Sequence, residues 1–175
     1  MQAEAGFMHL TGDSSGPPFK LGFAITDVVT ALYASNAVLA GLLHREQTGK
    51  GMYLRTSLYE CAVSALINQG SNFLNGEINP RRMGNHHPNI LPYGLYETAD
   101  SPIIICVGTP QQYLNMIEVL KMKNREEFST NGLRVKNREA FDKYLNEHLK
   151  IRNSEEVIET LRKNNVPCGK VNNLQ

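Results

Sequence analysis

The sequence predicts mostly helical structure: apolar helices belonging to a larger domain, followed by a small α+β domain. Residues 27–47 are apolar around nearly the whole helical circumference, which is typical of a helix buried inside something larger than itself. After a stretch with prolines at 77–92, strand-like runs at 93–98 and 103–107 precede amphipathic helices. This change of pattern marks two kinds of structure in one chain.

The domain boundaries follow from that change. We expect residues 1–76 to be part of a large domain, 77–92 to be a linker and 93–175 to be a small α+β domain able to fold alone. The chain ends at Gln175 without completing a helix or strand, and we expect it to be a piece of a longer protein.

Composition excludes several classes of function. Of the 175 residues, 41% are hydrophobic and 20% charged, which argues against disorder. Eighteen basic and 17 acidic residues are well mixed, which indicates neither a nucleic-acid surface nor a polybasic membrane surface. The cysteines at 61, 106 and 168 are far apart without a CxxC pair, so we expect no disulfide framework, no zinc site and a reducing, intracellular compartment.

No segment is expected to span a membrane. The longest apolar run, residues 28–43, contains several polar side chains and is shorter than the ~20 residues that a bilayer requires. The N-terminus has neither a basic region nor an apolar signal core, so we expect no signal peptide. We expect the cytoplasm or the mitochondrial matrix as location.

The elements of the first half are set by their boundary residues. Residues 1–24 are punctuated by glycine and proline and predict a loop with at most one short element. Thr26 is expected to cap a helix over 27–47, which Gly49 ends. Residues 51–56 alternate and predict a short strand, and Ser57 with Glu60 predicts a capping box at the start of a helix over 57–75.

The second half begins with a hairpin of the strands 93–98 and 103–107. Thr109 followed by Pro110 predicts the start of a helix over 110–120. Apolar residues at helical spacing predict further helices over 138–149 and 154–163, and a short segment at 166–171 closes the unit.

Asp27 is the first candidate for chemistry. It lies where a glycine-rich segment meets the N-terminus of a helix, among Phe23, Ile25 and Val28. A helix N-terminus favours an ionised carboxylate and apolar neighbours limit its hydration, a combination that suits a nucleophile. The alternative is that Asp27 only balances the helix dipole.

A second candidate is the loop after the first unit, formed by Gly84, Asn85, His86, His87, Pro88 and Asn89. Its backbone amides and imidazoles could donate hydrogen bonds to a developing oxyanion. The alternative is a solvated connecting loop. Adjacent histidines in an extended segment point to opposite faces, and no acid or cysteine has ligand spacing, so we expect no metal.

Several segments carry a resemblance to a known family in the right order along nearly the whole chain. They are Gly16-Pro17-Pro18, Leu21-Gly22-Phe23-Ala24-Ile25-Thr26-Asp27, Ala40-Gly41-Leu42-Leu43-His44-Arg45-Glu46-Gln47-Thr48-Gly49-Lys50-Gly51, Ser57-Leu58-Tyr59-Glu60, Gly84-Asn85-His86-His87-Pro88-Asn89-Ile90, Pro92-Tyr93 and Val166-Pro167-Cys168-Gly169. The sequence resembles the CaiB/BaiF-like family III CoA-transferases, and among them the succinate–hydroxymethylglutarate type.

The resemblance implies an α/β fold with a Rossmann-like large domain, a small domain and two interlaced subunits. It implies transfer of coenzyme A between carboxylic, and here dicarboxylic, acids, with acyl-CoA as substrate and no tightly bound cofactor. Asp27 would be the nucleophile that forms an aspartyl-CoA thioester. Because most CoA contacts would come from an N-terminal half outside this chain, we expect the chain alone to be inactive.

The family often has a glycine-rich flap where this chain has the bulkier residues 85–89. Two alternatives to a transferase stay open. One is an α-methylacyl-CoA racemase of the same fold, which would use a glutamate just after the strand that ends at Val107, where this chain has Gly108, Thr109, Pro110 and two glutamines. The other is a non-catalytic fragment or isoform.

Overall fold

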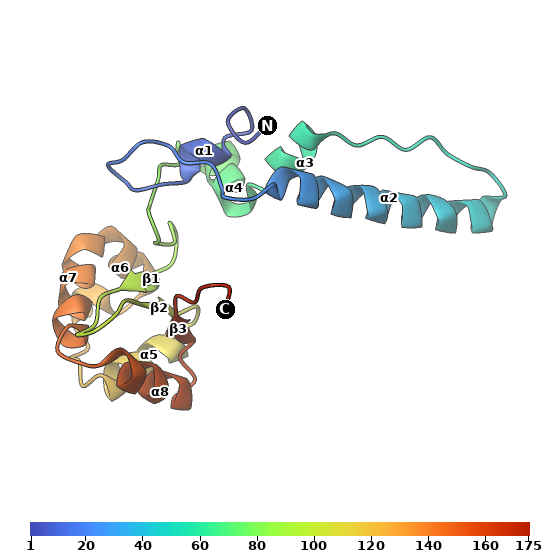
Figure 1. Cartoon of the computed structure of the whole chain (residues 1–175). Coiled ribbons are helices and arrows are strands. Elements are labelled where there is room, and N and C mark those ends of the chain that lie inside the picture. Colours follow the sequence, from blue (N-terminus) through green and yellow to red (C-terminus); the bar gives the residue numbers. More distant parts are fainter. The chain divides into compact units, whose positions relative to one another are not determined.

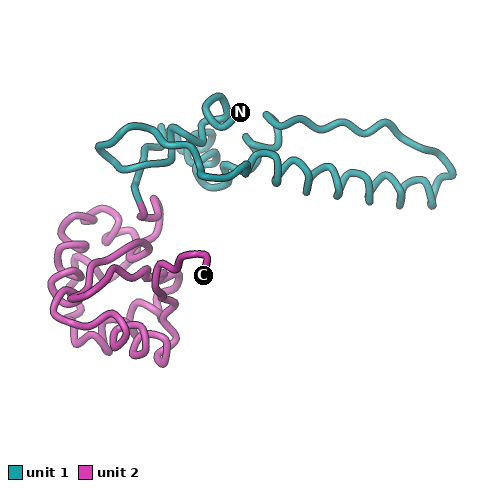
Figure 2. Tube along the Cα trace, in the orientation of Figure 1, with its two compact units in different colours: residues 1–84 teal, residues 85–175 magenta.

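The computed structural model describes residues 1–175 and divides the chain into two compact units. Unit 1 is Met1–Gly84 and unit 2 is Asn85–Gln175 (Figure 2). The division lies within residues 77–92, the segment that the sequence assigns to a linker.

Unit 1 is helical. Its elements are α1 (Phe7–Leu10), α2 (Ile25–Thr48), α3 (Leu58–Ser64) and α4 (Ile67–Gly76) (Figure 1). The long helix is thus confirmed, whereas the single helix predicted over 57–75 is wrong. It is interrupted between Ser64 and Ile67, where Ile67 has a φ of 48°, a backbone conformation that a β-branched residue rarely adopts.

The predicted cap at Thr26 is also wrong. The helix begins two residues earlier than predicted, at Ile25, and its N-cap is Ala24, which makes no side-chain bond. Thr26 therefore lies inside the first turn, is buried, and donates its hydroxyl to Asp27 Oδ2 at 3.3 Å. At the other end Gly49 is left-handed and its N–H binds Arg45 O at 2.8 Å, as predicted.

No strand forms over residues 51–56, because a strand needs a neighbour to pair with and unit 1 contains none. Instead the segment runs back along α2 (Figure 1), with Leu54 packed against Gly41. Ser57 caps α3 by accepting the Glu60 N–H at 3.2 Å, but the Glu60 carboxylate binds the Ser57 hydroxyl. The capping box is therefore half formed.

The apolar surface of α2 is exposed in this chain. Only Thr26 and Gly41 of the helix are buried, whereas Leu39 is 64% and Leu32 60% exposed. The sequence predicted this exposure for a helix separated from its covering partners. Contrary to the expectation from residues 28–43, the whole helix is long and apolar enough to cross a membrane, a test that core helices of soluble proteins also pass.

Unit 2 contains a three-stranded antiparallel sheet in the order β1-β2-β3, covered by helices. The strands are β1 (Tyr93–Tyr96), β2 (Ile103–Cys106) and β3 (Cys168–Lys170). The helices are α5 (Pro110–Val119), the 3-10 turn η1 (Glu126–Phe128), α6 (Asn131–Lys136), α7 (Arg138–Leu149) and α8 (Ser154–Lys163). The hairpin, α5, α7 and α8 agree with the sequence prediction, which did not contain η1 and α6.

Local sequence explains how α5 begins. Thr109 Oγ1 accepts the Gln112 N–H at 3.2 Å, and Gln112 Oε1 accepts the Thr109 N–H at 3.1 Å. This is a complete capping box with proline at the first helical position. The start of α5 directly after β2 is thereby fixed.

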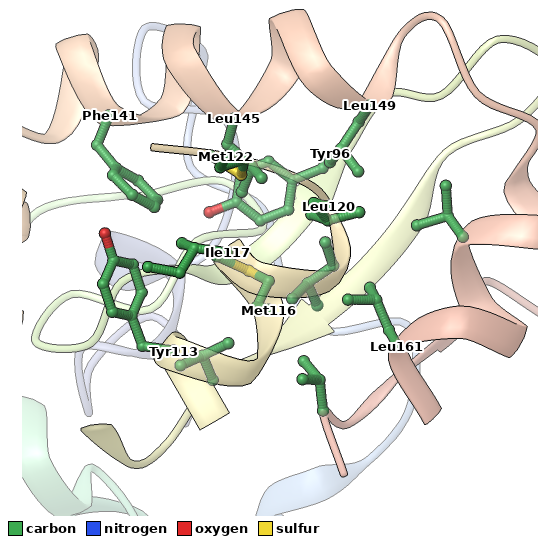
Figure 3. Close-up of a cluster of buried hydrophobic side chains, with 14 of the residues drawn as sticks. Tyr96, Tyr113, Met116, Ile117, Leu120, Met122, Phe141, Leu145, Leu149 and Leu161 are labelled. Carbon is green, nitrogen blue, oxygen red and sulfur yellow. The ribbon is translucent and has the colours of Figure 1, made fainter. Parts of the chain in front are cut away.

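The core of unit 2 lies between the sheet and three helices. Figure 3 shows Tyr113, Met116 and Ile117 of α5 and its C-cap Leu120 directed toward Phe141, Leu145 and Leu149 of α7 and Leu161 of α8, beside Tyr96 of β1. Most of these side chains are fully buried. The core supports α6, α7 and β1, and these three elements bind the candidate loop.

Candidate active site

Asp27 is in the first turn of α2, as predicted. Its side chain is exposed, and so are the neighbouring Phe23 and Val28. The apolar surroundings expected from the sequence therefore do not dehydrate the carboxylate within this chain. What remains is a solvent-accessible carboxylate at the positive end of a 24-residue helix.

Gln2 fixes the chain that leads into this turn. Its Oε1 accepts the Leu21 N–H at 2.8 Å, and its Nε2 donates to Phe23 O at 3.2 Å. The amide thus bridges Leu21 and Phe23, which lie four and two residues before α2 begins at Ile25. The helix start has no side-chain cap, and the Ile25 N–H bonds Phe23 O. Sequence reasoning missed Gln2, because a long-range side-chain contact leaves no local signal.

The candidate loop is divided between the units. Gly84 ends unit 1 with a φ of 58° and donates its N–H to Gly12 O at 3.1 Å. Asn85, His86, His87 and Asn89 lie together at the start of unit 2, whereas Asp27 belongs to unit 1.

His86 lies against β1. Its ring meets that of Tyr96 edge-on at 5.5 Å between centroids, and its Nδ1 is buried without a hydrogen-bond partner. A side chain at Gly94 would place a Cβ 2.5 Å from the same nitrogen, so only glycine permits this approach. The imidazole is therefore seated on the sheet rather than solvated.

His87 is held through its backbone and ring. Its N–H donates to Tyr93 O at 2.8 Å, its ring lies 5.1 Å from the Tyr93 ring, and its Nδ1 accepts the Asn89 N–H at 3.1 Å. Burial lowers the pKa of His87, and the Arg138 guanidinium lowers it further. The imidazole is thereby biased toward its neutral form, able to donate one hydrogen bond and accept another.

Behind His86 lies a half-buried carboxylate, that of Asp142. Tyr96 donates its hydroxyl to Asp142 Oδ1 at 3.1 Å. Burial raises the pKa of Asp142, while His86, the Tyr96 hydroxyl and Arg138 act in the opposite direction. Burial together with Asp142 also raises the pKa of Tyr96, which keeps its proton. Asp142, like Gln2, was not singled out by the sequence.

Each unit also contains a cavity. In unit 1 an apolar cavity of about 310 Å³ lies between α1 and α4, lined by residues such as Leu10, Leu66 and Phe73. In unit 2 a cavity of about 270 Å³ lies at the start of α5, lined by Gly108, Thr109 and the buried Arg134 among others, with no acidic residue. No group of three or more histidine, cysteine, aspartate or glutamate side chains could hold a metal ion.

Comparison with known proteins identifies the family. The sequence matches CoA-transferase family III over residues 1–175. The chain belongs to CoA-transferase family III. The family and its fold, inferred above from the segments around Asp27 and the loop, are thereby confirmed.

Relatives within CoA-transferase family III include two with assigned activities. The chain is 33% identical to human succinyl-CoA:glutarate CoA-transferase, over 99% of this chain and 40% of that protein. It is 31% identical to succinate–glutarate CoA-transferase of Agrobacterium fabrum, over 100% of this chain and 44% of that protein. The chain thus spans about 40% of the length of the curated relatives that it matches.

A solved structure of the family agrees. A CaiB/BaiF family protein from Brucella suis matches with a TM-score of 0.73 and 36% identity, covering 99% of this chain and 47% of that one. The helices of unit 1 and the α+β unit 2 are therefore elements of the family III fold.

Proposed function

We propose that this chain is the part of a CoA-transferase that carries the nucleophile, Asp27, and that the enzyme moves coenzyme A between dicarboxylic acids. The observation that carries the proposal is the position of Asp27. In a chain that matches family III from end to end, an exposed carboxylate stands in the first turn of a long helix. There the helix dipole stabilises the ionised form that attacks.

The proposed reaction splits one transfer into easier steps. An Asp27 oxygen attacks the thioester carbonyl of the acyl-CoA, the C–S bond breaks, and a mixed anhydride and the CoA thiolate result. The thiolate then attacks the Asp27 carbonyl, giving an aspartyl-CoA thioester and releasing the donor acid. The acceptor carboxylate repeats these steps in reverse, which regenerates Asp27.

The loop supplies the second part of the proposal. We assign Gly84, Asn85, His86, His87 and Asn89 to contacts with the substrate carboxylate or the oxyanion of each tetrahedral intermediate. The neutral bias of His87 supports this role, because a neutral imidazole can donate a hydrogen bond without moving a proton.

The proposed substrates follow from the relatives. Both named relatives are CoA-transferases whose names give succinate or succinyl-CoA and glutarate as the partners. This supports acyl-CoA and dicarboxylic acids as substrates here. Coenzyme A would be a substrate rather than a bound cofactor, and the family-length protein an interlaced homodimer within the cytoplasm or mitochondrial matrix. A racemase is disfavoured because residues 107–112, directly after β2, contain no acid, and no acid lines the cavity at Thr109.

The test uses a family-length protein that contains this chain. Incubated with succinyl-CoA, it should form a covalent adduct at Asp27 that hydroxylamine or borohydride traps. Asp27→Asn should form no adduct, and Asp27→Glu should lose at least ~100-fold in rate, since it displaces the attacking oxygens. Both should stay folded, because one first-turn charge contributes only about 1 kcal/mol.

Asp13→Asn is the matched control, since Asp13 is an exposed acid of unit 1 outside any helix; it should keep full activity. Turnover by folded Asp27→Asn would place the nucleophile elsewhere. The 175-residue chain alone should be inactive, and measurable transfer by it would contradict the proposal that it is one part of the enzyme.

A further inference from the structure

Three side chains from one short stretch of unit 2 hold the backbone of the candidate loop. We propose that Asn131, Arg134 and Arg138, called here the carbonyl clamp, are positioning residues for the transfer reaction. This inference rests on the proposed function, because it assumes that the loop contacts the substrate. It assigns a role to residues that lie 40 to 51 positions along the chain from the atoms they hold.

Arg138 holds the centre of the loop. It is the first residue of α7, and its Nη2 donates to His87 O at 2.9 Å and to Pro88 O at 3.1 Å. A planar guanidinium suits two neighbouring acceptors because its donors have a fixed direction. The two successive carbonyls are thereby fixed relative to the helix.

Asn131 and Arg134 of α6 hold the end of the loop at Asn89 and the backbone of Leu91 directly after it. Asn131 Nδ2 donates to Asn89 O at 2.8 Å, and its Oδ1 accepts the Leu91 N–H at 3.0 Å. Arg134 Nε donates to Leu91 O at 2.6 Å. Together with Arg138, the clamp binds four of the five carbonyls between His87 and Leu91.

The clamp itself is rigid. Arg134 is only 3% exposed, donates a second bond to Phe128 O at 2.8 Å, and lies 3.8 Å from the centre of the Tyr113 ring. Tyr113 and Phe128 belong to the core of unit 2. A buried guanidinium with these contacts moves only if the core opens, so the clamp transmits the rigidity of the core to the loop.

The residues that hold the loop are different from the side chains proposed to contact the substrate. The clamp binds backbone atoms only, so the imidazoles of His86 and His87 take no part in it. The clamp fixes the backbone from which they project, and their own ring contacts with Tyr96 and Tyr93 orient them further. A reacting group displaced by about 1 Å can cost on the order of 100-fold in rate. Positioning residues of this kind therefore act on the rate without touching the substrate.

The test compares arginine variants in the family-length protein. Arg138→Met removes both bonds and should lower kcat at least ~10-fold with little change in KM, because misplacement is felt most in the transition state. Arg138→Lys keeps the charge and a donor and should recover part of the loss. Arg152→Met is the control, since Arg152 Nη2 also binds a carbonyl in unit 2, that of Leu120 at 3.1 Å, away from the loop.

A second readout needs no activity. In the 175-residue chain, the pKa of His87 measured by NMR should rise in Arg138→Met, because the nearby positive charge that lowers it is gone. Hydrogen exchange at the His87 amide, bonded to Tyr93 O, should accelerate at the same time. Both should be unchanged in Arg152→Met.

The outcomes separate the two proposals. An unchanged His87 pKa and exchange rate in Arg138→Met would show that the clamp does not hold the loop. A changed loop with unchanged kcat, or a fall in kcat equal to that of Arg152→Met, would overturn the positioning role and leave the proposed function standing. A parent protein without transferase activity would overturn the proposed function and the positioning role together, and the NMR result would still decide whether the clamp forms.

Discussion

The two units of this chain differ in what they do with their apolar side chains. Unit 2 places residues of α5, α7 and α8 in one closed core, and most of them are fully buried. Unit 1 leaves residues such as Leu32, Leu39 and Phe73 more than half exposed. Apolar content alone therefore does not make a core, because each apolar face needs a second face to pack against.

The difference follows from how each unit relates to the family. The chain covers about 40% of the length of its curated relatives. Unit 2 contains both the sheet and the helices that cover it, whereas α2 contacts mainly α3 and the returning segment that includes Leu54. The reactive residue of the proposed mechanism thus belongs to the unit that depends on other parts of the protein.

The largest expected effect tests this contrast directly. Leu145→Ala in the core of unit 2 should lower the free energy of unfolding by about 2–5 kcal/mol, because it leaves a cavity. Leu39→Ala on α2, 64% exposed, should change it by less than about 0.5 kcal/mol in the 175-residue chain. Urea unfolding followed by circular dichroism measures both, and comparable losses would show that α2 is covered in solution.

The helix starts provide a smaller test. Thr109→Val removes the hydroxyl of the complete capping box and should cost about 1 kcal/mol. Thr26→Val removes a hydroxyl that caps nothing and should be nearly neutral to stability. Thermal unfolding of the two isosteric variants gives the comparison, and an equal loss from Thr26→Val would restore the cap that the sequence predicted.

The smallest effect is a pH dependence at the start of α8 in unit 2. The Ser154 N–H bonds Asp100 Oδ1 at 2.7 Å and the Ser154 hydroxyl bonds Oδ2 at 2.8 Å, and these bonds lower the pKa of Asp100 to about 2. Because the folded pKa lies below the usual 3.8, the stabilisation is complete above about pH 4 and is lost as the pH falls toward 2.

Hydrogen exchange at the start of α8 should therefore accelerate across that pH interval, and Asp100→Asn should remove the dependence. An unchanged profile in Asp100→Asn would mean that the bonds to Ser154 do not form in solution. In unit 1 the acids at helix starts accept side-chain hydroxyls rather than a backbone N–H: Asp27 accepts from Thr26 at 3.3 Å and Glu60 from Ser57 at 2.8 Å.

Local signals were enough to predict unit 2 in outline. Thr109 and Pro110 predicted where α5 begins, and helical periodicity predicted α7 and α8 with the bounds that the structure has. The predictions failed where a distant contact decides the structure. The segment 51–56 has strand character but no strand to pair with, and Thr26 could not cap a helix that already begins at Ile25.

Some residues of the candidate site could likewise be predicted from the sequence, and others could not. Asp27 and the loop could be found because their residue types, positions and resemblance to the family are visible in the sequence. Gln2, Arg138 and Asp142 could not, because they act on backbone atoms or buried groups far away in the chain. A backbone carbonyl looks the same in every residue, so a sequence does not show which carbonyls are bound.

Because backbone groups are the same in every residue, the clamp also affects how the loop can evolve. Since the clamp at Asn131, Arg134 and Arg138 recognises only main-chain atoms, substitutions at His86, His87 or Asn89 leave its bonds intact. The side chains that the proposed function assigns to substrate contact are then free to diverge while the scaffold stays constant. Gly94 of β1 is the exception, because any side chain there would displace His86. Position 94 therefore tolerates far less variation than the loop that packs against it.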